Sequence, residues 1–223
     1  MSRVAHPAGP LHGDVLPADH PPAPPADLNA LPAAIWPRGA RRGDDGVLTL
    51  AGADVRDLAE QFGTPLYVCD EEDVRSRCRD YMEAFGSEAR VFYAAKAFCS
   101  RAVLRWVSAE GLGVDVCTGG ELEVALSAGV PPEQITLHGN NKSLDELSRA
   151  LSAGIGHIVA DSFDEIARLA YLTDSSPGGQ PPGTPRDTIQ RPNILVRVTT
   201  GVEAHTHEFV ATAHDDQKFG FSL

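Results

Sequence analysis

A unit of one short apolar strand followed by one helix recurs about every 20 to 25 residues through the middle of the chain. The predicted helices begin near Ser100, Thr118, Ser143 and Ser162, and the predicted strands before them are RVFYAAKA, LGVDVC, ITLHG and HIVADS. Strands that are joined through helices lie parallel, because each helix returns the chain to the same edge of the sheet. The repeat therefore predicts an α/β fold built on a barrel-like series of parallel strands.

The ends of these helices carry recognisable capping residues. Two of the predicted helices close on an Ala-Gly pair, at Gly129 and at Gly154, as helix C-terminal caps often do. A hydroxyl residue at a helix start, with glutamate three residues later, is typical of a capping box. We expect such boxes at three starts: Thr118 with Glu121, Ser143 with Glu146, and Ser162 with Glu165.

The first 46 residues differ from the rest of the chain. They hold nine of the 17 prolines and no periodic apolar pattern, so we expect a disordered leader over 1–46. Three histidines in this leader are spaced irregularly among prolines and do not suggest a metal site. Residues 47–223 are expected to form one domain.

Other segments flank or interrupt the repeat. TPLYVCD at 64–70 predicts a strand, and the next residues predict a helix with Asp70 at its N-cap and Gly86 at its end. A Pro/Gly-rich stretch at 173–193 predicts a surface insertion. The segment 194–200 then predicts a fifth strand of the series.

Composition narrows the classes of function. The formal net charge is −12 and Lys and Arg form no cluster, so binding to nucleic acid or to anionic lipid is not expected. The four cysteines lack CxxC spacing, which argues against zinc and a disulfide framework. We expect no signal peptide, because the N-terminal residues lack an apolar h-region, and no membrane span, because no segment approaches roughly 20 apolar residues. We therefore expect a soluble cytoplasmic protein with a small-molecule site.

Polar side chains gather where the predicted strands end. Catalytic groups of parallel α/β barrels collect at this carboxyl rim, because the strand-to-helix loops and helix N-termini open there. The arrangement predicts an active site at this rim. Its candidate residues are Lys96, Asp115, Thr118, His138, Asn140, Asp161 and Arg197.

Lys96 lies inside the apolar run VFYAAKAF at 91–98. An unpaired buried ammonium costs several kcal/mol, so the lysine should either extend to an edge or lose its proton. In the second case the free amine would be a nucleophile toward an aldehyde, as formation of a Schiff base requires. The pattern alone leaves both interpretations open.

The other candidates also allow two interpretations. Asp115 is expected either to assist a cofactor or to cap the next helix, and Glu121 either to contact a cofactor or to complete its capping box. His138 is expected either to contact a ligand ring or to be a core histidine. Arg197 lies inside a predicted parallel strand, where a cation requires an anionic partner. No metal site is predicted from the remaining histidines, because no carboxylate or cysteine completes a ligand spacing: His205, His207 and His214.

Taken together, several motifs resemble one enzyme family. YAAKAF, GVDVCTGGELEVALSAG, ITLHGNNKS, GVEAHTHEF and DDQKFG are similar to the pyridoxal-phosphate-dependent diaminopimelate decarboxylases of actinobacteria, within the ornithine, arginine and diaminopimelate decarboxylase group. The resemblance runs from about residue 47 to the end of the sequence and keeps the order and spacing of the motifs.

The resemblance implies an alanine-racemase-like (β/α)8 TIM barrel with pyridoxal 5′-phosphate bound covalently to Lys96. It implies that Asp115, Glu121 and Arg197 lie near the cofactor and that His138 and Asn140 line the rim. It also implies an amino-acid substrate, decarboxylation of meso-2,6-diaminopimelate to L-lysine, and a homodimer. The segment 64–70 would belong to a second, β-rich domain, and Lys218 would lie near the dimer interface.

Several motifs of the family are missing from the sequence. A His-x-Gly-Ser segment, a glycine-rich phosphate loop and the partner of the pyridine nitrogen are not found, and the series stops after about five barrel strands. We therefore expect an N-terminal portion without the C-terminal β domain and with little activity alone. The alternatives are a decarboxylase of ornithine or arginine, and a non-catalytic remnant that binds the cofactor.

Overall fold

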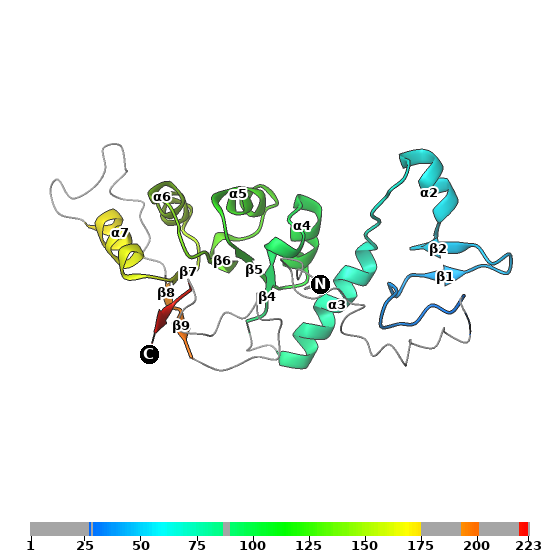
Figure 1. The fold of residues 1–223 in the computed structure, drawn as a ribbon, viewed down its shortest axis with the longest axis horizontal. Helices are drawn as coiled ribbons and strands as arrows, with labels where there is room; N and C mark the ends of the chain where they lie inside the picture. Colours follow the sequence, from blue (N-terminus) through cyan, green and yellow to red (C-terminus); the bar gives the residue numbers. More distant parts are fainter. Residues whose placement is uncertain (1–26, 28, 87–89, 175–192, 201–218, 223) are drawn as a thin grey trace, which may run out of the picture.

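The computed structural model describes residues 27, 29–86, 90–174, 193–200 and 219–222. A small N-terminal unit is followed by one long helix and then by a row of strands and helices (Figure 1). None of the helices in these ranges is long and apolar enough to cross a membrane.

The larger unit is a parallel sheet covered by helices. Within the described residues, each strand pairs with the next strand of the chain in the order β4-β5-β6-β7-β8, and every pair is parallel. This sequential order is that of a (β/α) barrel, whereas a doubly wound sheet reverses its strand order. The strands are β4 (Phe92–Ala94), β5 (Gly113–Val116), β6 (Ile135–Leu137), β7 (His157–Ala160) and β8 (Asn193–Val196).

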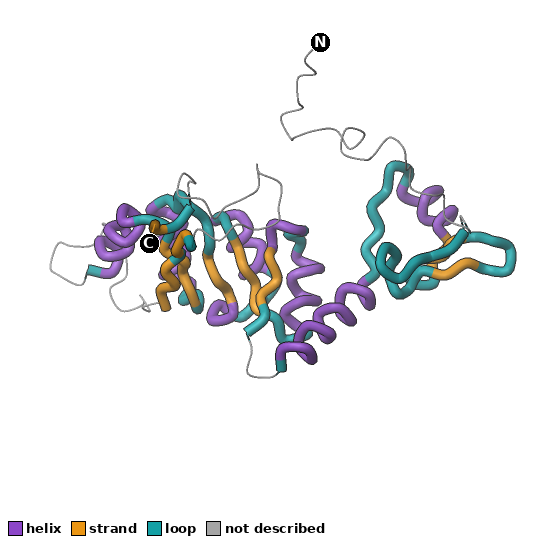
Figure 2. The backbone as a smooth tube through the Cα atoms, turned by 60° about the horizontal axis from the view of Figure 1, so that its bottom comes forward, coloured by secondary structure: helices purple, strands orange, loops and turns teal. Residues whose placement is uncertain are grey.

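The helices that follow the strands lie on one face of this sheet (Figures 1 and 2). Their bounds are α4 (Arg101–Ala109), α5 (Gly119–Ser127), α6 (Leu144–Ala153) and α7 (Phe163–Thr173). Leu122 on α5 and Leu147 on α6 have no exposed surface and pack in one cluster with Ile135 and Ile158 of the sheet. Each such side chain contributes about 1.5–3 kcal/mol through burial, so this interface stabilises the repeat.

In the described ranges, the parallel sheet has five strands, as the sequence predicts, and two further short strands lie outside it. The predicted strand 194–200 is interrupted at Arg197, which separates β8 from β9 (Val198–Thr199). A further short strand, β10 (Phe221–Ser222), pairs in parallel with β9. β9 and β10 form a separate two-stranded sheet, so the prediction of about five barrel strands is confirmed. The short strand β10 was not predicted, because two residues beyond a glycine carry too little pattern to indicate a strand.

The hydroxyl residues predicted at the helix starts are confirmed as N-caps. The side chains of Ser100, Thr118, Ser143 and Ser162 each accept a backbone N–H in the first turn of the helix that follows. Asp70 likewise caps α3 (Glu71–Phe85), which ends at Gly86 as predicted. Each cap satisfies an N–H that would otherwise lack a partner and contributes about 1 kcal/mol.

A reciprocal capping box forms at Ser143 and Glu146, and not at the other two predicted sites. The carboxylate of Glu121 accepts the N–H of Cys117 at 2.6 Å, one residue before the cap. The carboxylate of Glu165 turns into the core and pairs with Lys142. The prediction was wrong at these two positions because each carboxylate meets a stronger or better placed donor than the cap N–H.

Replacing Glu146 by alanine is expected to lower the free energy of unfolding at neutral pH by about 1–2 kcal/mol. The carboxylate accepts the N–H groups of Ser143 at 2.9 Å and Gly119 at 2.8 Å. The Ser143 N–H above all holds the pKa of Glu146 below its ordinary value of 4.5. Its contribution is therefore present above pH 4.5 and is lost as pH falls through the folded-state pKa.

Chemical denaturation at pH 7 and at successively lower pH values measures this effect. The variant should lose stability less steeply than the parent below pH 4.5. Glu123→Ala is the matched control on α5, because its carboxylate pairs with Arg149 at an exposed position. An equal loss at neutral pH in both variants would contradict the role assigned to Glu146.

The N-terminal unit is a small antiparallel sheet with one helix. It consists of β1 (Arg41–Arg42), β2 (Leu48–Leu50), β3 (Ala53–Asp54) and α2 (Val55–Phe62). β1 lies inside the range 1–46 for which we predicted disorder, so regular structure begins before residue 47; residues 1–26 and 28 lie outside the described residues. The N–H of Arg38 donates to Asp73 on α3, and the Arg38 guanidinium pairs with Asp80.

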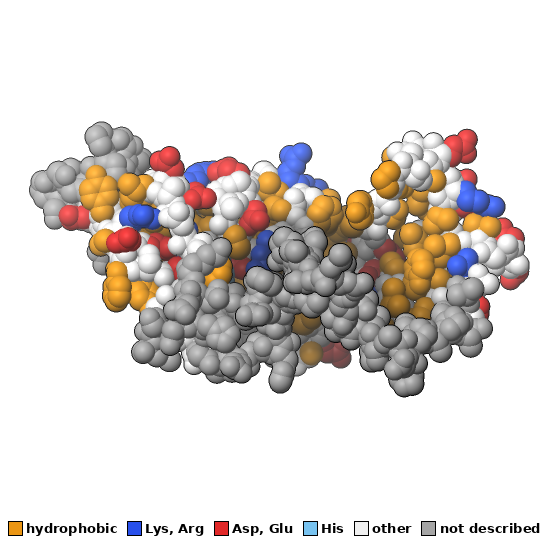
Figure 3. Space-filling view, in the orientation of Figure 1, with side chains coloured by type: hydrophobic (Ala, Val, Ile, Leu, Met, Phe, Trp, Pro, Cys, Tyr) orange, Lys and Arg blue, Asp and Glu red, His pale blue; other side chains and the backbone are white. Residues whose placement is uncertain are grey.

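The predicted strand at 64–70 is an extended connection without sheet pairing in the described part of the chain. Leu66, Tyr67 and Val68 are all exposed, with Tyr67 at 99%. Apolar side chains also gather over the N-terminal unit on the face shown in Figure 3. The prediction of a strand was wrong because β-forming residues supply propensity, whereas a strand also needs a neighbour to pair with.

Candidate functional site

A cavity of about 820 Å³ opens where the strands of the parallel sheet end. Its polar lining comes from the carboxyl ends of different strands and from the loops after them, as the repeat predicts. The polar and ionisable side chains at its wall are Lys96, Asp115, Cys117, His138, Asn140 and Arg197. The fold therefore brings together five of the six residues that the family resemblance places at the cofactor or the rim, all except Glu121.

Lys96 lies beyond the end of its strand. β4 ends at Ala94, and residues Ala95–Ala97 form a short 3-10 helix that turns Lys96 toward the cavity. Ala95 is the buried residue of this turn, whereas Lys96 is exposed. Of the two interpretations that the sequence left open, the exposure of Lys96 favours the side chain that extends to an edge, because the apolar run continues in sequence after the strand has ended. The lysine side chain is accessible to a ligand in the cavity.

Asp115 and His138 form a pair in the wall of the cavity. Asp115 lies on β5, opposite Ala94 of β4 in the register, and His138 directly follows β6. The carboxylate of Asp115 hydrogen-bonds to Nδ1 of the His138 ring. The side chains are 18% and 39% exposed respectively, so the pair is sheltered while the ring remains reachable. The alternative of a core histidine is wrong.

Cys117 lines the same cavity, although sequence analysis did not single it out. Burial raises the pKa of its thiol, and the nearby carboxylates of Asp115 and Glu121 raise it further. The thiol is therefore held in its neutral form at neutral pH. Alternation gives a signal that could have found it, because residues two apart on a strand face the same side.

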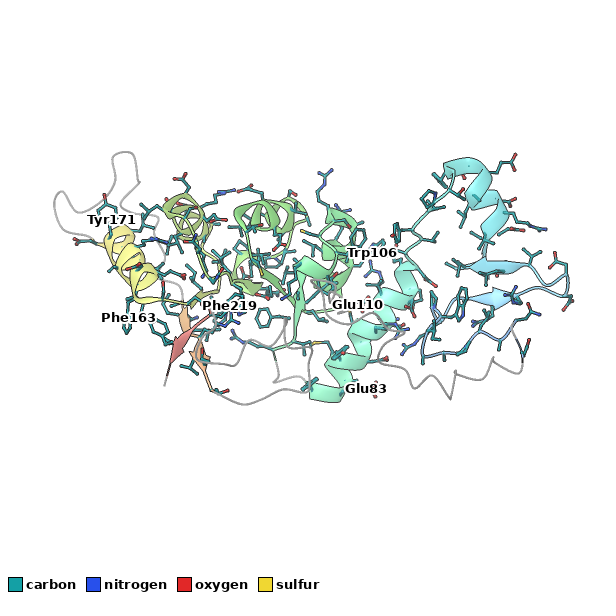
Figure 4. The ribbon with its side chains drawn as sticks, viewed as in Figure 1. Glu83, Trp106, Glu110, Phe163, Tyr171 and Phe219 are labelled. Carbon is teal, nitrogen blue, oxygen red and sulfur yellow. The ribbon has the colours of Figure 1, made fainter. Side chains whose placement is uncertain are left out.

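Arg197, between β8 and β9, has the anionic partner that the sequence led us to expect. Its guanidinium lies 3.3 Å from the carboxylate of Asp161, whose side chain is 2% exposed, and 4.3 Å from the centre of the Phe219 ring. The other oxygen of Asp161 accepts the N–H of Gly220 at 2.6 Å. Phe219, labelled in Figure 4, also lines the cavity. The 219–222 segment is thereby fixed to β7 and to Arg197.

The remaining predicted residues are placed differently. Glu121 is absent from the cavity wall, and its carboxylate binds the backbone N–H of Cys117, which is in the wall. Asn140 lies in the wall beside Gly139. The described residues contain no group of His, Cys, Asp and Glu that could hold a metal ion. Four predicted or discussed residues lie outside the described residues: His205, His207, His214 and Lys218.

Comparison with known proteins identifies the class of this fold and site. Residues 71–223 match the family model of the pyridoxal-dependent decarboxylases, pyridoxal binding domain. The chain belongs to this family, and its parallel sheet with outer helices is part of an alanine-racemase-like (β/α) barrel.

Several diaminopimelate decarboxylases are similar to this chain. The chain is 54% identical over 197 residues to that of Mycobacterium tuberculosis, covering 88% of this chain and 41% of that protein. It is 49% identical over 228 residues to that of Mycobacterium leprae, covering 98% and 44%. A solved structure of the M. jannaschii enzyme in complex with L-lysine aligns with a TM-score of 0.69 and 29% identity, covering 84% and 42%. The chain thus spans about two-fifths of the length of these relatives.

The cofactor of this family is pyridoxal 5′-phosphate, and the cavity suits it chemically. An aldehyde needs a primary amine, and Lys96 presents one at the wall. The ring of the cofactor carries polar substituents, and Asp115, His138 and Arg197 can form polar contacts with them. The cavity volume also falls within the range of about 300–1,000 Å³ that is usual for small-molecule sites.

Proposed function

We propose that this chain provides the cofactor-binding part of a decarboxylase that converts meso-2,6-diaminopimelate to L-lysine. One observation supports this proposal most strongly. A single cavity at the carboxyl end of the sheet is lined by Lys96, Asp115, His138 and Arg197. The activity named for the relatives supports the choice of substrate.

Lys96 is proposed to hold pyridoxal 5′-phosphate through its side-chain amine. The position of Lys96 on a short turn beyond β4 lets the side chain move between a cofactor and an incoming amine without distorting the sheet. Its exposure also keeps the amine accessible to proton exchange with solvent. When bound, the cofactor supplies an electron sink for the electrons released as carbon dioxide leaves.

The Asp115–His138 pair is proposed to set the proton on the imidazole. Because the Asp115 carboxylate accepts from Nδ1, the ring proton stays there and Nε2 becomes the nitrogen that can accept from a ligand. Glu121 supports this arrangement from outside the cavity, since it holds the Cys117 N–H at the end of the same strand.

Arg197 is proposed to favour anionic groups in the cavity. Its charge is partly balanced by Asp161, and the Phe219 ring fixes the plane of the guanidinium. The substrate is proposed to be a small amino acid, the working protein a homodimer and its location the cytoplasm. These proposals follow from the family and from the activity named for its members.

The test is release of carbon dioxide by the purified chain in the presence of pyridoxal 5′-phosphate. Release from meso-2,6-diaminopimelate, and not from ornithine or arginine, supports the proposed reaction. Release from ornithine or arginine instead supports a decarboxylase of another basic amino acid. Cofactor binding without release from any of these substrates limits this chain to the cofactor-binding role, and failure to bind pyridoxal 5′-phosphate rejects the proposal.

A further inference from the structure

Lys142 and Glu165 form an ion pair inside the protein. Both side chains are 1% exposed, and Nζ of Lys142 lies 2.7 Å from Oε1 of Glu165. The same ammonium donates to the carbonyl oxygens of Gly139 at 2.6 Å and Val159 at 2.7 Å. All three protons of the ammonium therefore have acceptors.

These acceptors belong to different parts of the cavity wall. Gly139 lies in the loop after β6, and Val159 is on β7; both line the cavity. Glu165 lies on α7, so the ammonium of Lys142 joins the loop, a strand and a helix at one point. A guanidinium nitrogen of Arg168 donates to the carbonyl oxygen of Lys142 at 2.8 Å and fixes the loop from the side of α7.

The loop itself has little freedom to adopt this shape without help. Gly139 has φ of +116°, and a methyl group there would lie 3.0 Å from the carbonyl oxygen of Cys117. The loop thus passes very close to the end of β5 and turns in a conformation that only glycine adopts easily. His138 and Asn140, on either side of Gly139, both line the cavity.

Stability alone does not account for the buried pair. Removing two charges from water is costly, and an apolar pair of similar volume often gives equal or greater stability. In addition, Oε2 of Glu165 is buried and has no hydrogen-bond partner among the described residues. What the pair provides, and an apolar pair does not, is a set of directional bonds to two carbonyl oxygens of the cavity wall.

We propose that Lys142 and Glu165 are positioning residues that hold the loop of residues 138–141 in the shape that binds the cofactor. This inference rests on the proposed function, because it takes the cavity to be the site of pyridoxal 5′-phosphate. Neither side chain touches the cofactor itself. The pair acts through Gly139 and Val159, whose carbonyl oxygens it fixes.

The test replaces both charges together. In the double variant Lys142→Met/Glu165→Leu, the unfolding midpoint should stay within a few degrees of the parent, because no charge is left unpaired. Its affinity for pyridoxal 5′-phosphate should fall about tenfold, and the absorbance of the bound cofactor should shift, because the loop is no longer held. The matched control is Glu123→Leu/Arg149→Met, which removes an exposed pair between α5 and α6 and should bind as the parent does.

A double variant that folds and binds the cofactor like the parent overturns the proposal. Hydrogen exchange on the unmodified chain gives a test that needs no variant. The backbone amides of residues 138–142 should be protected before any cofactor is added, and rapid exchange there also overturns the proposal. Failure of the parent to bind pyridoxal 5′-phosphate would instead count against the proposed function. In that case, protection of the amides of residues 138–142 would still test whether the Lys142–Glu165 pair holds the loop.

Discussion

Replacing Lys96 by alanine is expected to reduce covalent capture of pyridoxal 5′-phosphate to background, a loss on the order of 100-fold or more. Lys96 is the lysine of the cavity wall, and its amine is exposed there. After reduction with borohydride, digestion and mass spectrometry should locate the added cofactor mass on the peptide that contains Lys96.

The sequence makes this experiment unusually clear, because it contains three lysines: Lys96, Lys142 and Lys218. Lys142 is buried at 1% exposure, with acceptors for each of its protons, so labelling there is not expected. Lys218→Ala is the matched control and should retain labelling at Lys96. Label on another lysine in the folded parent, or equal labelling of the Lys96 variant, would show that the cofactor is held elsewhere.

Replacing Gly156 by alanine is expected to destabilise the fold by about 3 kcal/mol or more. Gly156 lies just before β7, and its N–H donates to Pro132 and Ile135. A methyl group there would fall far inside contact distance of the Glu133 carbonyl oxygen and 2.9 Å from its carbon. Because the clash is with backbone, the helical turn before β6 would have to move. Chemical denaturation measures the loss.

Gly120→Ala is the matched control for this substitution. Gly120 lies in the first turn of α5, and the nearest atom to an added methyl group would be the Thr118 hydroxyl at 3.8 Å. Alanine favours a helix over glycine, so this variant should be unchanged or up to about 1 kcal/mol more stable. Equal destabilisation of the two variants would mean that crowding at Gly156 is not the cause.

The features that could be predicted from the sequence depend on neighbours in the chain. The N-caps at Ser100, Thr118, Ser143 and Ser162 and the glycines after α5 and α6 are local signals, and the structure confirms them. The positions of polar residues relative to strand ends also follow from local pattern. For this reason Asp115, His138 and Arg197 could be assigned to one rim before any contact between them was known.

The features that were missed depend on residues far apart in the chain. The Glu165 carboxylate pairs with Lys142, which lies 23 residues earlier, and therefore does not complete the capping box of its own helix. Nothing in the sequence near Glu165 indicates this pairing. The extended segment 64–70 has the residues of a strand but no partner in the described part of the chain. Lys96 is exposed because β4 ends two residues before it, a boundary that the continuous apolar run conceals.

The neighbour-to-neighbour order of the parallel sheet has a consequence for biosynthesis. Each strand from β5 to β8 pairs with the strand made just before it, so no unit has to wait for a distant one. Once one strand–helix unit has left the ribosome and folded, the free edge of its strand is available for the next strand to pair with. Assembly can therefore keep pace with translation, and the unpaired edges that attract aggregation are at each moment two short strands, β4 and the strand made last.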